Sequence, residues 1–155
     1  MSGLKLGDTI PAVTLLDAEG TTIDLAALKG APLVVYFYPK ADTPGCTVEA
    51  QDFTRLAPEF AHFSAQVLAV SRDAPAKLCK FRDKYGLTVR LASDEDGAVC
   101  EAFGTWVEKQ NYGRSYMGIE RSTFLFGADG KLAKEWRKVR VKGHAEAVLE
   151  AAKAL

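Results

Sequence analysis

An unbroken apolar run at residues 33–38, of sequence LVVYFY, constrains the possible folds of this chain more than any other feature. Polar residues do not alternate with the apolar ones, so the run predicts a strand that is covered on both faces. Residues 67–71 (VLAVS) have the same character, and between the two runs apolar residues recur at close to helical spacing. Strand, helix and strand in this order predict a right-handed parallel crossover, a building unit of α/β proteins.

The segments around this unit complete the element order of a thioredoxin-like fold. Residues 13–16 and 21–25, joined by a turn, predict an N-terminal β-hairpin. Pro58 is expected to kink the first helix or to end its first segment. Further helices are predicted at residues 75–85, 97–103 and 144–154, and a second hairpin at residues 122–126 and 131–136. We therefore expect a single α/β domain over residues 1–155, with a central mixed β-sheet flanked by helices.

The charge of the chain argues against two classes of partner. Its 20 Lys and Arg residues balance 20 Asp and Glu residues, so there is no general attraction to nucleic acid or to an anionic membrane surface. No apolar run approaches the roughly 18 residues needed to cross a bilayer. Residues 1–8 have neither the apolar core of a signal peptide nor the composition of a transit peptide, which predicts a cytoplasmic protein.

The cysteines and histidines do not form a metal-binding pattern. Cys46, Cys79 and Cys100 are odd in number and far apart, which predicts neither a structural disulfide framework nor a cysteine-based zinc site. His62 and His144 are distant from each other and from the cysteines in the sequence, so metal-ligand spacing is absent as well. We expect no metal and no bound cofactor.

The segment that carries chemistry lies at residues 36–49, where the buried strand ends, a loop follows and a helix begins near Cys46. A thiol in the first turn of a helix is close to unpaired backbone N–H groups and to the positive end of the helix dipole, which favours its thiolate form. Thr43 stands three residues earlier, so its hydroxyl can face the sulfur or an oxygen of a substrate. This is a Cys-x-x-Cys frame with threonine in first place, which favours a chemistry of one sulfur over dithiol exchange.

Attack of a thiolate on an O–O bond needs more than an ionised sulfur. The departing oxygen gains negative charge, and fixed donors in comparable oxyanion sites stabilise such charge by about 2.7–4 kcal/mol each. Arg121 stands at the start of a predicted strand that could lie beside the first helix, and its permanently charged guanidinium suits both a thiolate and a peroxide oxygen. The alternative for Arg121 is an ion pair with Glu120 or Glu49 at the surface.

Residues 39–46 (PKADTPGC), taken with Glu49 and residues 120–124 (ERSTF), resemble the peroxiredoxin family, and within it the bacterioferritin comigratory protein or PrxQ group. The likeness covers most of the chain. It implies reduction of hydrogen peroxide or alkyl hydroperoxides to water or alcohol, which leaves the attacking cysteine as a sulfenic acid. It also implies that thioredoxin, or a similar dithiol protein, reduces the enzyme again.

The same resemblance implies a role for each residue of the motif. Cys46 would be the peroxidatic sulfur, and Pro39 would shield the pocket around it. Thr43 would hydrogen-bond the peroxide, while Arg121 would activate both the sulfur and the substrate.

The sequence departs from the family pattern at the second, resolving cysteine. Many members carry it five residues after the first, but Gln51 occupies that position here. Other members use a cysteine in the following helix, which makes Cys79 our candidate. Because a disulfide needs Cα atoms within about 7 Å, we expect local unwinding around Cys46, and around Cys79, during turnover. Cys100 is interpreted as a small buried residue, and if neither sulfur resolves, an external thiol reduces the sulfenic acid directly.

Two other functions are compatible with the same fold. One is a thiol–disulfide exchange protein, against which the threonine at position 43 argues, and the other is a redox sensor or binding module without catalysis. Thr43 could act only as a helix cap, and Trp106 is interpreted as a core or pocket-wall aromatic. The basic run at residues 131–142 is interpreted as a solvated face. We expect the protein to be a monomer or a weak homodimer.

Overall fold

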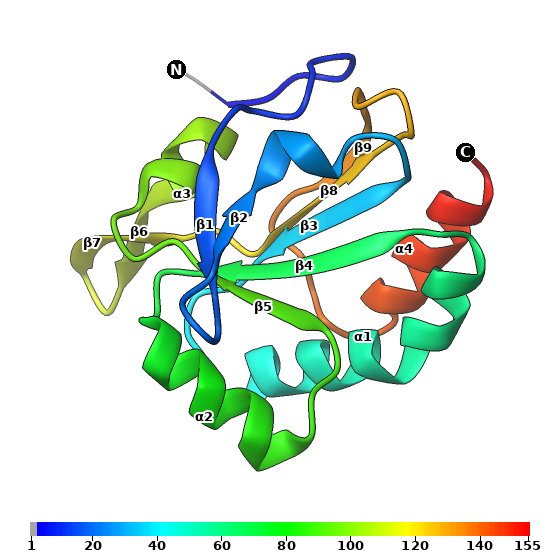
Figure 1. The fold of residues 1–155 in the computed structure, drawn as a ribbon. Coiled ribbons are helices and arrows are strands. Elements are labelled where there is room, and N and C mark those ends of the chain that lie inside the picture. Colours follow the sequence, from blue (N-terminus) through cyan, green and yellow to red (C-terminus); the bar gives the residue numbers. More distant parts are fainter. Residues whose placement is uncertain (1–2) are drawn as a thin grey trace.

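A seven-stranded mixed sheet forms the centre of the fold (Figure 1). The structure is a computed structural model and describes residues 3–155. In chain order its elements are β1 (Thr14–Asp17), β2 (Thr22–Asp24), the 3-10 helix η1 (Leu25–Leu28), β3 (Leu33–Phe37), α1 (Pro44–His62), β4 (Gln66–Ser71), α2 (Pro75–Tyr85), β5 (Arg90–Ser93), α3 (Ala98–Phe103), β6 (Trp106–Asn111), β7 (Arg114–Ile119), β8 (Ser122–Phe126), β9 (Leu132–Trp136) and α4 (His144–Lys153). The strand order across the central sheet is β2-β1-β5-β4-β3-β8-β9.

The two apolar runs form the parallel pair that the sequence predicts. Strand β3 pairs with β4 from Leu33 opposite Gln66 to Phe37 opposite Val70, and α1 connects the two strands. On its other side β3 pairs antiparallel with β8, and β8 continues antiparallel to β9. The sheet is therefore mixed and flanked by helices, which confirms the predicted thioredoxin-like architecture.

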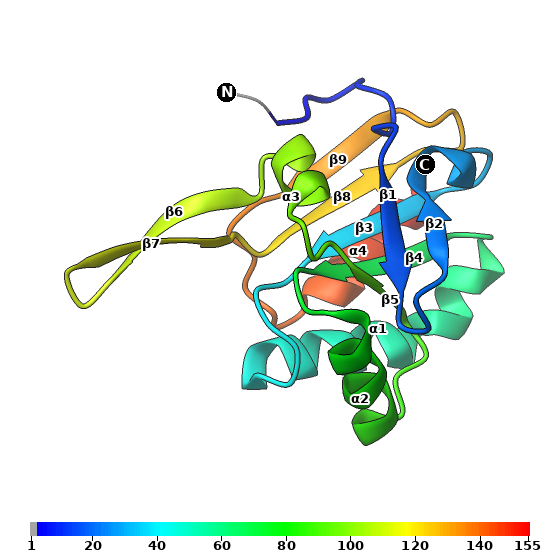
Figure 2. The same cartoon turned by 60° about the vertical axis from the view of Figure 1, so that its left-hand side comes forward.

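Every residue of β3 is buried because its side chains enter two separate cores, one on each face of the sheet. Val34 and Tyr36 pack in the core beneath α1, α2 and α4, which lie on the same side of the sheet in both ribbon views (Figures 1 and 2). Leu33, Val35 and Phe37 pack in the core that includes α3 and the β1–β2 hairpin. Burial on both faces explains why the run shows no polar alternation.

The predicted N-terminal hairpin, the second hairpin and the four predicted helices are all present, and the structure excludes one of the two effects expected at Pro58, an end of the helical segment. Helix α1 continues through Pro58 to His62, so the proline does not end a helical segment. Leu56 and Phe60, on either side of it, are buried in the core under the sheet. This packing holds the helix together although Pro58 cannot donate a backbone hydrogen bond.

Three strands were not predicted. Strand β5 has only four residues and acquires its strand conformation by pairing with β4 on one side and β1 on the other. Strands β6 and β7 form an antiparallel hairpin that extends away from the body of the protein (Figure 2). Both of its turn residues, Tyr112 and Gly113, have positive φ angles, as in the primed turns of two-residue hairpins. Its strands are mostly polar and exposed, so their sequence lacks the hydrophobic periodicity on which strand prediction depends.

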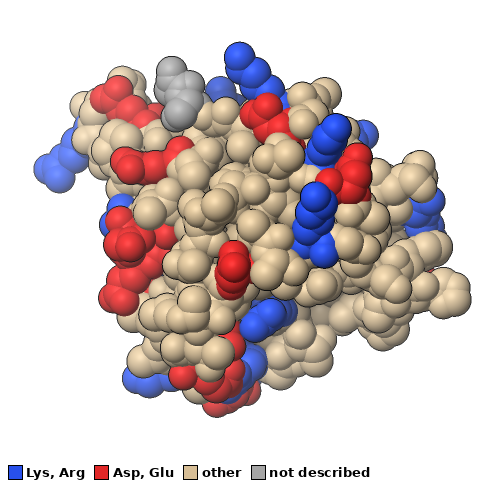
Figure 3. All heavy atoms as spheres, turned by 45° about the horizontal axis from the view of Figure 1, so that its top comes forward, with Lys and Arg blue, Asp and Glu red and all other residues tan. Residues whose placement is uncertain are grey.

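The outer surface mixes charges of both signs. Basic and acidic side chains both occur over the face drawn in Figure 3, in line with the equal numbers of the two in the sequence. Within residues 3–155, none of the helices combines the length and the apolar character that a membrane span requires. No group of three or more His, Cys, Asp or Glu side chains in that part of the chain is arranged to hold a metal ion.

A buried histidine gives the fold a testable dependence on pH. His144 is 6% exposed, and burial, with a smaller contribution from Arg121, lowers the pKa of its imidazole from 6.5 to about 4. The unfolded chain therefore binds a proton at His144 at a higher pH than the folded chain does. Between about pH 6.5 and 4, stability is lost as the pH falls, by an amount on the order of 2–3 kcal/mol from this residue.

We expect His144→Gln to lose less stability on acidification than the unsubstituted protein, measured as the difference between the two in the free energy of unfolding in urea at pH 4, 5.5 and 7, because the opposing contribution of Glu49, whose pKa burial raises to about 7, is common to both. His144 accepts or donates a hydrogen bond with Thr123 Oγ1 at 2.7 Å, so the variant starts from a lower stability at pH 7. The exposed His62 provides the matched control, His62→Gln. If His144→Gln loses as much stability on acidification as His62→Gln does, His144 does not contribute to the pH dependence.

Candidate active site

Cys46 lies where the central strand β3 gives way to helix α1. The chain leaves the sheet at Phe37, forms a loop, and enters the helix at Pro44 with Thr43 as the N-cap residue. Cys46 is thus in the first helical turn, where backbone N–H groups have no partner within the helix. Its side chain is only 2% exposed in this state of the protein.

The register between β3 and β8 brings Arg121 to the same end of the sheet. Phe37 pairs with Ser122, so Arg121, one residue before β8, lies beside the point where the Cys46 loop begins. Its Nη2 donates to Sγ of Cys46 at 3.3 Å. The backbone carbonyl of Arg121 also accepts the N–H of Val139 at 2.9 Å, which fixes the residue from its other side. The predicted meeting of Cys46 and Arg121 is therefore present in the structure.

Glu49 completes a charged group of three side chains. Nη1 of Arg121 donates to Oε1 of Glu49 at 2.6 Å, so one guanidinium contacts both the carboxylate and Cys46. Glu49 is 1% exposed, and burial raises the pKa of its carboxyl to about 7 although the charge of Arg121 opposes the rise. Burial by itself would lower the pKa of Arg121, but Glu49 and Cys46 outweigh it and raise that pKa. The guanidinium therefore stays charged beside the sulfur.

A glycine leaves room for this guanidinium. A Cβ atom at Gly45 would lie 3.3 Å from Nη2 of Arg121, closer than most side-chain contacts allow. The small residue before Cys46 therefore permits Arg121 to approach the first turn of α1.

Thr43 has a different hydrogen bond from the one that the sequence suggested. Its Oγ1 donates to the backbone carbonyl of Lys40 at 2.8 Å and makes no side-chain cap to the helix, although Thr43 is the N-cap residue. With its proton committed to Lys40, the hydroxyl oxygen keeps lone pairs that can accept a proton donor such as the O–H of a peroxide.

Pro39 is exposed and borders a groove of about 460 Å³ between the loop and the β6–β7 hairpin. Trp106 and Lys109 also line the groove. The guanidinium of Arg72 lies 4.4 Å from the ring centroid of Trp106, a cation–π contact that fixes this wall. Trp106 is thus a pocket-wall aromatic, one of the two positions predicted for it.

The other two cysteines have very different surroundings. Cys79 is partly exposed on α2, and its Sγ receives a hydrogen bond from Nη2 of Arg82 at 3.2 Å. Cys100 is fully buried on α3, where burial first and Asp94 second raise the pKa of its thiol. This agrees with the interpretation of Cys100 as a small core residue. All three cysteines are free, so the structure contains no Cys46–Cys79 bond.

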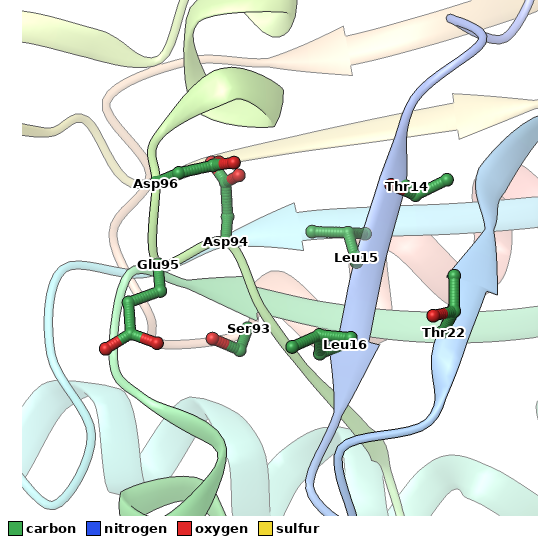
Figure 4. A pocket seen from close by; sticks show the side chains of 8 residues that line it. All are labelled: Thr14, Leu15, Leu16, Thr22, Ser93, Asp94, Glu95 and Asp96. Atoms are coloured by element: carbon green, nitrogen blue, oxygen red, sulfur yellow. The ribbon is translucent and has the colours of Figure 1, made fainter.

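A second hollow, of about 380 Å³, contains three consecutive acidic residues (Figure 4). Asp94, the first of them, already accepts the backbone N–H groups of Val99 at 3.0 Å and Cys100 at 2.7 Å. Its carboxylate therefore holds the start of α3 in place. The residues that line this hollow include no Cys, His, Lys or Arg, and Cys46 is not among them.

Comparisons with known proteins place the chain in a family. Residues 6–135 match the AhpC/TSA family. Peroxiredoxin Bcp of Xanthomonas campestris is 50% identical over 149 residues, which cover 94% of this chain and 93% of the relative. Peroxiredoxin Bcp of Bacillus subtilis is 44% identical over 150 residues, 97% of this chain and 96% of the relative.

A solved structure extends the likeness to three dimensions. The bacterioferritin comigratory protein of Xanthomonas campestris, studied for its alkyl peroxide reduction activity, superposes with a TM-score of 0.89 at 46% identity. The match covers 95% of this chain and 98% of that one.

Proposed function

We propose that Cys46 is the sulfur that attacks the peroxide, since the chain belongs to the AhpC/TSA family and is a peroxiredoxin. The observation that carries the proposal is the 3.3 Å hydrogen bond from Arg121 Nη2 to Cys46 Sγ in the first turn of α1. Neither of the other two sulfurs combines a helix N-terminus with a partly buried arginine. The family assignment also favours peroxide reduction over the disulfide exchange and sensor functions that the fold alone would allow.

The reaction begins with the thiolate of Cys46 and a hydroperoxide in line with it. The sulfur bonds to the peroxide oxygen that carries hydrogen as the O–O bond breaks, and the other oxygen leaves and takes up a proton, equal in number to the one that the thiol released on ionising, which gives water or an alcohol. Cys46 becomes a sulfenic acid. Arg121 stabilises the negative charge on the sulfur and on the departing oxygen, and Thr43 accepts a hydrogen bond from the substrate. Pro39 and the adjoining wall keep bulk water away from the reacting atoms.

Peroxiredoxins need a thiol reductant to return the oxidised cysteine to its starting state, and we propose that Cys79 receives the oxidation from Cys46 first. Its thiol attacks the sulfenic sulfur, an S–S bond forms, and the hydroxyl leaves as water. Thioredoxin, or a similar dithiol protein, then reduces the disulfide. The cytoplasmic location, the monomeric or weakly dimeric state and the single-domain organisation over residues 1–155 stay predictions from the sequence.

The proposal is tested by following the oxidation state of each cysteine after one equivalent of peroxide. We expect a trapping reagent for sulfenic acids to label Cys46, and peptide mass spectrometry to find a Cys46–Cys79 disulfide when the reagent is left out. In Cys79→Ser, the sulfenic acid on Cys46 should persist, whereas the matched variant Cys100→Ala should still form the disulfide. First oxidation at Cys79 or Cys100 would refute the role of Cys46, and a disulfide between two chains would refute the role of Cys79.

A further inference from the structure

The loop before Cys46 is tied to the end of the helix that carries Cys79. Oδ1 of Asp42 accepts a hydrogen bond from the hydroxyl of Tyr85 at 2.6 Å, and its Oδ2 is 2.9 Å from Nζ of Lys84. We call these three side chains, Asp42, Lys84 and Tyr85, the Asp42 clasp. Asp42 immediately precedes Thr43, so the clasp acts on the backbone that positions the proposed peroxide site.

The backbone of Asp42 is strained in this arrangement. Its φ angle is +62°, in the left-handed region that residues with a side chain adopt at a cost, although aspartate tolerates it better than most. The carboxylate offsets that cost through its two partners. The hydroxyl of Tyr85, and then the ammonium of Lys84, lower the pKa of Asp42, which shows that both partners favour the charged carboxylate. When the clasp opens, the loop is free to leave the strained conformation.

A second contact fastens the same loop to the start of α2. The backbone N–H of Ala41 donates to Oδ2 of Asp73 at 2.8 Å, and Lys77 pairs with Oδ1 of Asp73 at 3.3 Å. Ala41 is thus held near the start of α2 and Asp42 near its end, and Cys79 lies between the two ends of this helix. The loop and α2 are fixed relative to each other while both contacts persist.

The two sulfurs are held by different partners in this state. Arg121 contacts Cys46, whereas Arg82 contacts Cys79, and both thiols are free. A disulfide requires an S–S separation of about 2.05 Å with Cα atoms within about 7 Å. Formation of the disulfide therefore takes Cys46 away from Arg121 and Cys79 away from Arg82, and contacts that tie the loop to α2 oppose any movement of the two segments relative to each other.

We propose that the Asp42 clasp holds the Cys46 loop against α2 and that its opening accompanies formation of the Cys46–Cys79 disulfide. The inference rests on the proposed function, since it assumes that Cys46 is oxidised and Cys79 resolves it. Asp42, Lys84 and Tyr85 do not touch the reacting atoms and are positioning residues. The clasp sets how long the sulfenic acid survives, and hence how often a second peroxide oxidises it to sulfinic acid before the disulfide forms.

Tyr85→Phe isolates the clasp with the least disturbance. The variant removes one hydroxyl and keeps the ring that packs edge-on against Phe81 at 5.8 Å. We expect disulfide formation to become about three- to tenfold faster, the effect of losing one hydrogen bond of modest net strength. Formation of the sulfenic acid should change by less than about twofold, because the clasped loop still predominates. Asp42→Asn should act in the same direction, since asparagine tolerates the left-handed conformation and loses the charge that attracts Lys84.

The experiment mixes full-length protein with limiting hydrogen peroxide in a quenched-flow instrument and blocks free thiols at successive times. Mass spectrometry then gives the sulfenic and disulfide fractions, and excess peroxide gives the sulfinic fraction. The matched control is Tyr112→Phe, because Tyr112 is 97% exposed at the tip of the β6–β7 hairpin. The inference predicts faster disulfide formation and less sulfinic acid in Tyr85→Phe and Asp42→Asn, but not in Tyr112→Phe.

Each other outcome has a distinct meaning. An unchanged or slower disulfide step in both clasp variants, with the disulfide still forming in the unsubstituted protein, overturns the clasp and leaves the proposed function intact. A sulfenic acid on Cys46 that never forms the disulfide in the unsubstituted protein overturns the resolving role of Cys79 and the clasp together. If no sulfenic acid forms on Cys46 in the unsubstituted protein, the proposed function is contradicted.

Discussion

Replacing Cys46 by serine is expected to lower peroxide consumption to the uncatalysed rate, a loss of at least about 10³-fold, when a thiol reductant is in excess. A serine hydroxyl is not ionised near neutral pH and is a far weaker nucleophile toward oxygen than a thiolate. The other sulfurs cannot take over the reaction. Cys79 contacts Arg82 and not Arg121, and burial together with Asp94 raises the pKa of the Cys100 thiol, which keeps that sulfur from ionising.

The measurement is the rate of peroxide loss at several peroxide concentrations, with circular dichroism and thermal unfolding to check the fold. Serine and cysteine are similar in size, and Cys46→Ser should keep the structure of α1. Cys100→Ala is the matched control, because it also removes a buried thiol but leaves the proposed site untouched. If Cys46→Ser consumes peroxide at more than about a tenth of the original rate, a residue other than Cys46 reacts with the peroxide.

The parts of the fold that were predictable are those with a local physical signal. The run at residues 33–38 predicts a strand buried on both faces, and the helix predicted at residues 75–85 ends as expected, at Gly86 with a φ of +61°. Strand β5 has no such signal, since its four residues become a strand only by pairing with β1 and β4. The polar β6–β7 hairpin depends on its turn rather than on a hydrophobic pattern.

The residues of the candidate active site likewise divide into those that a local sequence signal predicts and those that it does not. Cys46 and Thr43 are near neighbours in the sequence, so their proximity followed from the loop and the helix start. Arg121 could be linked to Cys46 only through the motif resemblance and the expected order of the strands, and the register of Phe37 with Ser122 is what brings it there. The hydrogen bond from Thr43 to Lys40 was not foreseen, because a loop backbone conformation has no periodic signature.

Contacts between distant segments were the least accessible to sequence reasoning. Asp42 and Tyr85 are 43 positions apart, and each alone is an ordinary polar residue. Glu49 was visible as part of the motif, but its burial and its bond to Arg121 at 2.6 Å depend on how α1 packs on the sheet. A strained φ at Asp42 is likewise a property of the folded loop.

Because one guanidinium contacts both Cys46 and Glu49, Arg121→Ala is the most informative second substitution. We expect the second-order rate constant for peroxide reduction to fall by about 10²–10⁴-fold, since one donor to developing oxygen charge contributes about 2.7–4 kcal/mol and Arg121 also contacts the sulfur. Arg121→Lys should recover only part of this loss, because an ammonium cannot contact Cys46 and Glu49 with the same planar fork. Stopped-flow measurement of the first oxidation isolates this step from the reductant.

Loss of the Arg121 charge also changes the pKa of Glu49. This allows the effect of Arg121→Ala on peroxide reduction to be separated from its effect on protein stability. Without Arg121, the buried carboxyl loses the group that opposes the rise of its pKa above about 7. The folded chain already holds a proton on Glu49 to a higher pH than the unfolded chain does, and without Arg121 it holds it to a higher pH still, so Arg121→Ala should lose more stability than the unsubstituted protein as the pH rises from about 4.5. Glu49→Gln in the same chain removes that titration. We expect the double variant to regain stability at pH 8 and to stay as slow toward peroxide as Arg121→Ala, with the exposed Arg114→Ala as control. Recovery of peroxide reduction in the double variant would mean that Arg121 serves only to neutralise Glu49, and that another group activates the sulfur.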